Sequence, residues 1–328
     1  MRRAVVVGVA SLLLIPAVTL FGLALAEGPA GVEVVKRQMI REAARISDLG
    51  QATARAWLLR AFSENLTEQM VVDAVNAAMT NNGSNPYVEA FGTIVTSGND
   101  SAIPHGDPND DAENVLEPGE VVVVDLGARF KGWVSDNTKT YYLGKDPPEN
   151  YTIRYHLVRE AQQLAVKEIR NMARAGDVDG AARNYIEAGG YEIPHCVGHG
   201  LGLYVHTPPL ICSPDDENRL KTSSNDVVAI EPGIYIEGEF GIRIEDDWAV
   251  LRTGSEQYTH APSEYQESLL SPMNATELPV EITQVPSNPA GSPLLNILIV
   301  LSIVVVAAAA FLVITRIRAY RLTRRRHG

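Results

Sequence analysis

An apolar run near the end of the chain restricts which residues can fold in water. The run Leu294–Ile314 has about 21 residues without a charge, and six arginines follow it between Arg316 and Arg326. An uncharged stretch of this length with basic residues on one side is typical of a transmembrane helix with a cytoplasmic tail. We therefore expect one membrane-spanning helix at 294–315 and a basic cytoplasmic tail at 316–328.

The first 26 residues form a second apolar segment. Two arginines precede the run Ala4–Leu25, and Ala24 and Ala26 offer a cleavage site, which is the layout of a secretory signal peptide. The run is also close to the ~20 residues that span a membrane, so an uncleaved N-terminal membrane segment is the alternative for 1–26. In both cases we expect residues 27–270 to lie outside the cytoplasm, joined to the cell membrane by a Pro/Ser-rich linker at 271–293.

The charge of the exported part limits its partners. All 40 acidic residues lie between Glu27 and Glu281, but only 20 of the 28 basic residues do, so this part carries a charge of about −20. Such an acidic surface repels a phosphate backbone, and we expect no nucleic-acid partner. The chain has two cysteines, Cys196 and Cys212, which could form a disulfide. The sequence does not decide whether they do, because two cysteines do not define a disulfide framework.

Residues 27–270 alternate twice between helical and strand patterns, which predicts an α+β domain built from two similar halves. Apolar spacing predicts two or three helices over 32–81, one of them beginning after Thr67 as its N-cap. The other expected elements are a strand at 118–127 with an antiparallel partner at 132–144, helices at 152–175 (with Gly176 as its stop) and 181–187, and strands at 226–236 and 242–251.

Two predicted hairpins each bring a pair of carboxylates together. If the first turns near Phe130-Lys131 and the second at Gly238, the members of each pair lie opposite one another on neighbouring strands. The pairs are Asp125 with Asp136, and Glu231 with Glu245. Buried carboxylates that close cannot all ionise without a compensating cation, so we expect a positive ion between them.

Three histidines lie between the hairpins, in the glycine-rich stretch Ile193–Pro209: His195, His199 and His206. Four carboxylates with one or two imidazoles suit two divalent ions, and the oxygen-rich ligand set favours Mn²⁺, with Co²⁺ and Zn²⁺ as alternatives. A two-metal site positions and activates water for attack on a carbonyl or phosphoryl centre. The pattern therefore indicates a metal-dependent hydrolase.

Three segments in this order resemble a known family. They are DLGARFKGWVSD at 125–136, HCVGHGLGLYVH at 195–206 and IEPGIYIEGEFGIRIED at 230–246. With an Asp–Asp gap of 11 and a His–His gap of seven, they resemble the M24 metallopeptidases of the pita-bread fold, which include methionine aminopeptidase, prolidase and aminopeptidase P. The resemblance covers roughly residues 32–262 and implies a pita-bread domain with two pseudo-symmetric halves.

The resemblance also implies five metal ligands. Asp125 matches the ligand held by one metal, and Asp136 and Glu245 match the two carboxylates that bridge both metals. His199 and Glu231 match the ligands of the other metal, and Glu231 also matches the general base. We therefore expect two divalent ions as the cofactors of residues 27–270.

Further positions match residues on the substrate side. His206 matches the histidine that steadies the substrate carbonyl or the oxyanion, and His105 matches the one that contacts the scissile peptide bond. His195 and Arg243 are expected to touch substrate or to support the ligands. Together with Tyr235, these two residues favour the branch of the family that acts on proline peptides.

The favoured function is a membrane-anchored extracytoplasmic exopeptidase that removes N-terminal residues from peptides, of the Xaa-Pro type, through metal-activated water. The sequence departs from the proline branch at two places. The stretch between Glu27 and Val32 has no room for the extra N-terminal domain of that branch, and Thr207 stands where that branch often has an acidic residue. The alternatives are a specificity like that of methionine aminopeptidase and a catalytically inactive peptide- or protein-binding domain. A homodimer is left open.

Overall fold

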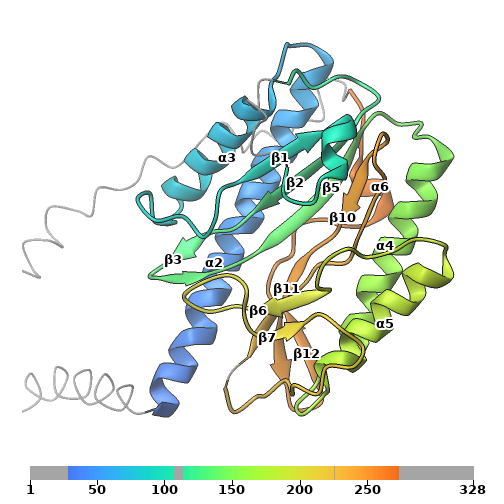
Figure 1. Cartoon of the computed structure of the whole chain (residues 1–328). Helices are drawn as coiled ribbons and strands as arrows, with labels where there is room; N and C mark the ends of the chain where they lie inside the picture. The colour runs from blue at the N-terminus through green and yellow to red at the C-terminus, as the bar shows by residue number, and fades with distance from the viewer. Residues whose placement is uncertain (1–28, 107–113, 225, 273–328) are drawn as a thin grey trace, which may run out of the picture. The chain divides into compact units, whose positions relative to one another are not determined.

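The computed structural model describes residues 29–106, 114–224 and 226–272 (Figure 1). The expected signal segment at 1–26, the membrane helix at 294–315, the tail at 316–328 and nearly all of the linker lie outside the described residues. Within the described ranges, no helix is both long and apolar enough to cross a membrane.

The first half of the domain packs two helices against a four-stranded sheet. α2 (Pro29–Leu58) leads through a 3₁₀ turn, η2 (Leu59–Phe62), towards α3 (Glu68–Asn81). Thr67 caps α3, as expected, because its side chain accepts a hydrogen bond from the Met70 amide at 3.3 Å. The sheet has the order β1-β2-β5-β13, with β1 (Ile94–Ser97), β2 (Val121–Leu126), β5 (Asn137–Leu143) and β13 (Leu269–Leu270), and η3 (Gly98–Ala102) follows β1.

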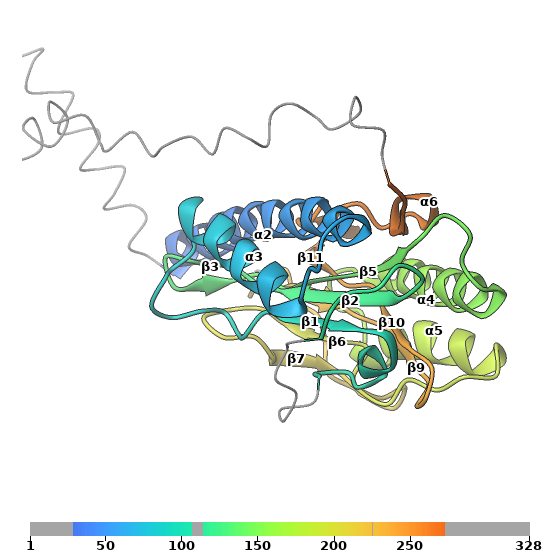
Figure 2. The ribbon, with the colours of Figure 1, turned by 90° about the horizontal axis from the view of Figure 1, so that it is seen from above.

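The second half repeats this arrangement with a five-stranded sheet. α4 (Glu149–Glu168) and α5 (Ala175–Ala188) lie side by side (Figure 2), and α6 (Tyr265–Ser268) is a single turn near the end. The strand order is β12-β11-β8-β6-β7, with β6 (Gly198–Gly200), β7 (Thr207–Ile211), β8 (Val227–Ile230), β11 (Asp246–Leu251) and β12 (Gly254–Gln257). The expected repetition of helices followed by strands is therefore present.

One pair of helix boundaries predicted from the sequence is wrong. The helix expected at 152–175 ends at Glu168, and the one expected at 181–187 already begins at Ala175, so that Gly176 lies in its first turn. A Cβ atom at Gly176 would collide with the carbonyl oxygen of Pro214. This glycine permits close packing of a loop against α5 and does not end a helix.

The first hairpin turns one position later than expected. Between β3 (Arg129–Phe130) and β4 (Trp133–Val134), Lys131 and Gly132 have φ values of 49° and 92°, the two positive angles of a type I′ turn. The ladder of β2 and β5 consequently pairs Asp125 with Thr138, so the predicted pairing of Asp125 with Asp136 is wrong.

The second hairpin has the predicted register. β9 (Gly233–Tyr235) pairs with β10 (Gly241–Arg243), and Gly238 lies in the turn with a φ of 79°. The pairs Ile230–Asp246 and Gly233–Arg243 flank the position at which Glu231 faces Glu245.

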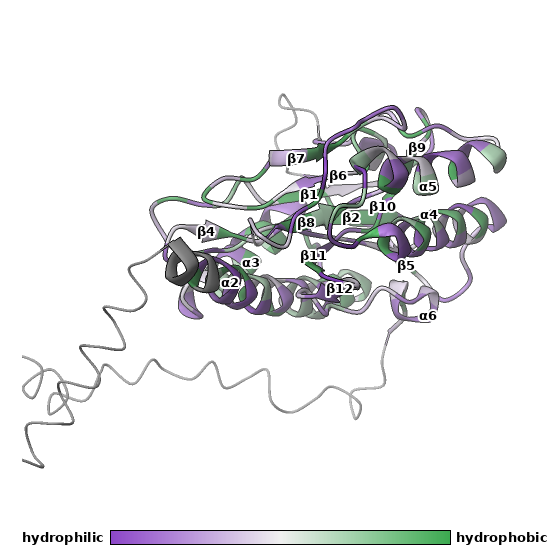
Figure 3. Cartoon of the chain, turned by 90° about the horizontal axis from the view of Figure 1, so that it is seen from below, coloured by the Kyte–Doolittle hydropathy of each residue, from purple (hydrophilic) through white to green (hydrophobic). Residues whose placement is uncertain are grey.

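The two halves meet at β5 and the second hairpin. The Glu245 amide donates to the Thr138 carbonyl at 3.0 Å, and a buried ion pair joins Lys139 Nζ to Asp246 Oδ1 at 2.8 Å. In Figure 3, β2 and β8 are mainly hydrophobic, β6 is pale to hydrophilic, and the helices have mixed hydropathy. One apolar core lies beneath α2 and α3 and another beneath α4 and α5, so the meeting line between the halves can hold polar side chains.

Candidate metal centre and active site

Four side chains of the ligand type converge where the two halves meet. His199 Nε2 lies 3.4 Å from Glu231 Oε1, 3.6 Å from Asp136 Oδ2 and 4.0 Å from Glu245 Oε1. His199, Asp136 and Glu245 are buried and Glu231 is partly buried. A metal held at about 2.0–2.2 Å from each ligand atom separates those atoms by spacings of this size.

Strand order explains why these residues meet. β6 lies next to β8, with His199 paired to Ala229, so that His199 lies close to the end of β8 where Glu231 follows. Pro232 then interrupts the strand, while the Glu231 amide still donates to the Val197 carbonyl at 2.8 Å. The backbone of Glu231 is thus fixed although it lies between two strands.

Asp125 enters the same site from β2. Arg243 Nη2 donates to Asp125 Oδ2 at 2.7 Å, and Arg243 Nε donates to the hydroxyl of Thr138 at 3.1 Å. That hydroxyl donates to Glu245 Oε2 at 2.7 Å. Asp125 and Glu245 therefore each accept a hydrogen bond from the protein through one carboxylate oxygen, and the other oxygen of each does not take part in it.

The unused polar atoms fit a cation. Asp125 Oδ1, His199 Nε2 and Glu245 Oε1 are buried and make no hydrogen bond within the described part of the chain. Burial, followed by the charges of neighbouring carboxylates, raises the pKa of Asp136 and of Glu245. Burial also raises the pKa of Glu231 to about 8. Divalent ions bound to these carboxylates would offset the free-energy cost of burying them in their ionised form.

Two overlapping groups of three residues are close enough to share an ion. Asp136, His199 and Glu245 form one, and His199, His206 and Glu231 form the other, each with ligand atoms within 4.8 Å of one another. Asp125 belongs to neither group, although it shares the cavity. His206, expected on the substrate side, therefore also has the position of a ligand.

A cavity of about 310 Å³ opens onto these groups. Its wall is partly apolar and partly polar, formed by Phe91, Gly92, Ile94, His105, Asp125, Asp136, Val205, His206, Glu231 and Glu245. Both histidines that were expected to face substrate, His105 and His206, line it. Desolvation and the charge of Arg243 lower the pKa of His105, which favours its neutral form.

His195 lies behind the cavity and does not line it. Its Nδ1 donates to the Cys196 carbonyl at 2.7 Å, because a carbonyl can only accept, and its Nε2 accepts from the Tyr235 hydroxyl at 2.9 Å. Tyr235 in turn accepts from Arg243 Nη1 at 3.0 Å. A chain of hydrogen bonds thus connects His195 to Arg243 and through it to Asp125.

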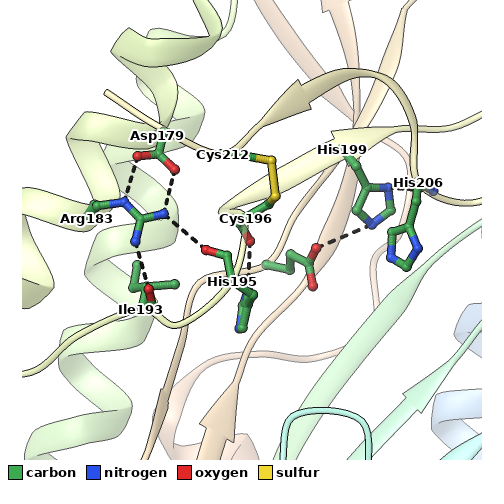
Figure 4. The surroundings of a disulfide bond; sticks show 9 residues. Asp179, Arg183, Ile193, His195, Cys196, His199, His206 and Cys212 are labelled. Carbon is green, nitrogen blue, oxygen red and sulfur yellow. Dashed lines mark hydrogen bonds and ion pairs between the residues drawn. A yellow bond between two sulfur atoms is a disulfide. The ribbon is translucent and has the colours of Figure 1, made fainter. Parts of the chain in front are cut away.

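Sequence reasoning missed several supporting residues. Arg183 on α5 binds the buried Asp179 with two hydrogen bonds of 2.8 Å and donates to the carbonyls of Ile193 at 2.7 Å and His195 at 3.1 Å (Figure 4). The i, i+4 spacing of Asp179 and Arg183 was a usable signal for a pair on one helix face, but not for its target. Thr138 gave no signal beyond its position two residues after Asp136.

A disulfide connects Cys196 to Cys212, the possibility that the sequence left open. It joins the segments before β6 and after β7, so that His199 and His206 lie within the loop that it closes (Figure 4). The rings of these two histidines are 4.4 Å apart between centroids and nearly perpendicular.

Comparisons with known proteins agree with this architecture. The model of metallopeptidase family M24 matches residues 38–252. The Xaa-Pro dipeptidase of Pyrococcus horikoshii is 37% identical over 229 residues, which cover 69% of this chain and 62% of that protein. The chain spans about three fifths of the length of the curated relatives it matches.

Solved structures give the same result. The X-Pro aminopeptidase of Thermotoga maritima MSB8 has 32% identity and a TM-score of 0.61, covering 70% of this chain and 62% of that one. The dipeptidase PepE of Mycobacterium ulcerans has 32% identity and a TM-score of 0.64, covering 72% and 60%. The domain therefore has the pita-bread fold, and the chain belongs to metallopeptidase family M24.

Proposed function

We propose that the chain is a metal-dependent exopeptidase that removes the N-terminal residue from peptides whose second residue is proline. The observation that carries this proposal is that the side chains of the five expected ligands meet beside one cavity, which four of them line, and that several of their buried polar atoms have no hydrogen-bond partner among the described residues. The five are Asp125, Asp136, His199, Glu231 and Glu245. Those side chains fit two divalent ions, of which we favour Mn²⁺ over Co²⁺ and Zn²⁺ because most of the ligand atoms are oxygens.

When bound, the metal ions would supply Lewis acidity and an activated water. Glu231, at the cavity wall, would accept the proton of the attacking water and return it to the amine that leaves. His206 would donate a hydrogen bond to the developing oxyanion, and His105 would contact the scissile peptide. The C–N bond breaks, the water oxygen stays on the carbonyl carbon, and the proton reaches the proline nitrogen.

Two observations support proline peptides as substrates. Two relatives that each align with about 70% of this chain are named Xaa-Pro dipeptidase and X-Pro aminopeptidase. The cavity also presents Phe91, Ile94 and Val205 beside its charged groups, and such apolar walls suit a pyrrolidine ring.

We further propose that the domain acts outside the cytoplasm, attached to the membrane through 294–315. The support is the uncharged run before the arginine-rich tail and the signal-like first 26 residues. Labelling of intact cells with an impermeant reagent, compared with lysed cells, tests this arrangement; labelling of 27–270 only after lysis would contradict it.

The activity is tested with the full-length chain, stripped of metal and supplied in turn with Mn²⁺, Co²⁺ or Zn²⁺. We expect release of the first residue from Xaa-Pro peptides and little release from Met-Ala peptides. Glu231→Gln should lower kcat by about 10²–10⁴-fold, the usual effect of losing a general base. The matched control is Glu256→Gln, which removes an exposed acid paired with Arg41 and should leave kcat unchanged.

Two results would count against this proposal. Release of Met from Met-Ala peptides without any turnover of Xaa-Pro peptides would transfer the specificity to the methionine aminopeptidase branch. Absence of turnover with every metal, together with tight peptide binding that Glu231→Gln leaves unchanged, would favour a non-catalytic binding domain.

A further inference from the structure

Three main-chain segments meet on one buried guanidinium. Arg129, at the base of the first hairpin turn, is only 8% exposed. Its Nε donates to the Glu89 carbonyl at 2.9 Å, and its Nη1 donates to the Gly132 carbonyl at 2.9 Å and to the Leu203 carbonyl at 2.6 Å. The amide of Arg129 also donates to the hydroxyl of Ser84 at 3.1 Å. The loops around residues 85–90 and 201–206 are therefore both bound to the hairpin through this residue.

All three acceptors of the guanidinium are main-chain carbonyls. Hydrogen bonds from a charged donor are stronger than neutral ones, and the planar fork of arginine can serve several acceptors at fixed angles. A lysine ammonium at Arg129 would bring charge but not this geometry. The chemistry of the residue thus matches a device that fixes loops relative to one another.

The loop 201–206 has a backbone conformation that neighbouring residues must hold in place. His206 has a φ of 55°, in the left-handed region that residues with a side chain rarely adopt. A conformation of this kind persists only where its surroundings hold it. The carbonyl of Gly202 accepts from the Val134 amide at 3.0 Å, and the next carbonyl, that of Leu203, is held by Arg129.

The same loop forms part of the cavity wall. Val205 and His206 line the cavity, and the ring of Tyr204, which is 70% exposed, lies with its centroid 5.9 Å from the Arg129 guanidinium carbon. The 85–90 loop leads directly to Phe91, another lining residue. None of the five side chains assigned to metal lies in either loop, although the His206 amide donates to His199 Nδ1 at 3.3 Å. Displacement of either loop would therefore alter the wall while the assigned ligands keep their own strands and segments.

We propose that Arg129 is a positioning residue of the active site, which holds the 201–206 loop so that His206 faces the substrate. The inference rests on the role proposed above for His206. It assigns Arg129 an effect on turnover through His206 and no effect on metal content.

A double-mutant cycle on the full-length, metal-loaded chain tests this assignment. We expect Arg129→Met to lower kcat on the order of 100-fold, as displacement of a catalytic group by about 1 Å can do. Arg129→Lys should restore little of the lost kcat. In both variants the amount of bound metal should stay at the wild-type level. In a His206→Ala background, Arg129→Met should change kcat by less than about twofold, because both changes remove the same contribution.

The matched control is Arg37→Met, which removes another partly buried arginine that donates to a main-chain carbonyl, that of Val250. It should leave kcat unchanged. An Arg129→Met effect of equal size in the wild-type and His206→Ala backgrounds would overturn the inference. An unchanged kcat in His206→Ala would overturn both the proposed role of His206 and the catalytic part of the inference.

Chymotrypsin gives a readout that needs no turnover, because Leu203 and Tyr204 are exposed sites for it within the loop. Cleavage there should be faster in Arg129→Met than in the wild type or Arg37→Met, with thermal unfolding measured beside it to separate loop release from global unfolding. Equal cleavage rates would overturn the inference even if the peptidase activity is present. Faster cleavage in a chain without peptidase activity would support the anchoring of the loop and contradict the proposed function alone.

Discussion

His195 shows how a residue near the site is kept neutral by its surroundings. Burial lowers its pKa to about 4, from an ordinary value of 6.5. The hydrogen bonds to Cys196 and Tyr235 fix one tautomer, with the proton on Nδ1. The ring can therefore accept from Tyr235 throughout the neutral range, and the line of hydrogen bonds to Arg243 and Asp125 stays intact.

This lowered pKa predicts a pH dependence of stability. Between about pH 6.5 and pH 4 the unfolded chain binds a proton at His195 that the folded chain does not, so the free energy of unfolding falls as the pH is lowered through this window. The contribution is at most about 3 kcal/mol. Urea unfolding at pH 7 and pH 5 should show a smaller loss for His195→Gln than for the wild type; an equal loss in both would contradict the assignment.

The sequence alone predicted which residues have the chemistry of this site, because ligand types and spacings belong to the residues themselves. It predicted Asp125, Asp136 and Glu231 as candidate ligands, and the structure brings them to one cavity. It could not predict the contacts of Arg129, since the three acceptors are carbonyls that any residue would offer. Main-chain partners leave no trace in composition, and only the folded chain reveals them.

At the level of elements, the two hairpins differ in how well their geometry could be foreseen. In the second hairpin, Gly238 indicates the position of the turn. A turn at Gly238 predicts the register of β9 and β10 that the structure shows. In the first, Lys131 occupies a position with positive φ where glycine or asparagine is usual, so the turn signal was weak. A displacement of the turn centre by one residue changed the partner of Asp125 to Thr138.

The same turn offers a stabilising substitution. Lys131→Asn should raise the free energy of unfolding by about 0.5–1 kcal/mol, because asparagine tolerates the left-handed conformation better than lysine. Urea unfolding measures the change. Lys145→Asn, at another exposed lysine without positive φ, is the control and should have little effect. A loss of stability in Lys131→Asn would show that the lysine makes contacts that outweigh its backbone cost.

At the scale of the whole molecule, the candidate metal centre lies on the line along which the two halves join, so its charge affects the packing of both halves. Burial and the neighbouring charges of Glu231 and Asp125 raise the pKa of Glu245, which means that its ionised form is costly when no cation is bound. The metal-free chain therefore carries a repulsion at its own centre.

Removal of metal should reveal this repulsion. In the presence of a chelator we expect Glu245→Gln to have a higher Tm than the wild type, because the variant no longer buries a carboxyl group whose pKa burial raises. With Mn²⁺ the order should reverse, since a metal at 100 times its Kd stabilises the wild type by about 2.7 kcal/mol and the variant has lost a ligand. Thermal scans under both conditions test this. Glu256→Gln, which is exposed, should shift neither scan, and a chelated Glu245→Gln less stable than the chelated wild type would argue against a repulsive centre.

The disulfide between Cys196 and Cys212 ties the order of the site to the redox state of its surroundings. Closing a loop of 16 residues removes chain freedom worth about 3 kcal/mol from the unfolded state. Such bonds persist in oxidising compartments and are rare where thiols are kept reduced. The segment that carries His199 and His206 is consequently most costly to order before the disulfide forms, so the proposed peptidase activity should depend on the oxidation of Cys196 and Cys212.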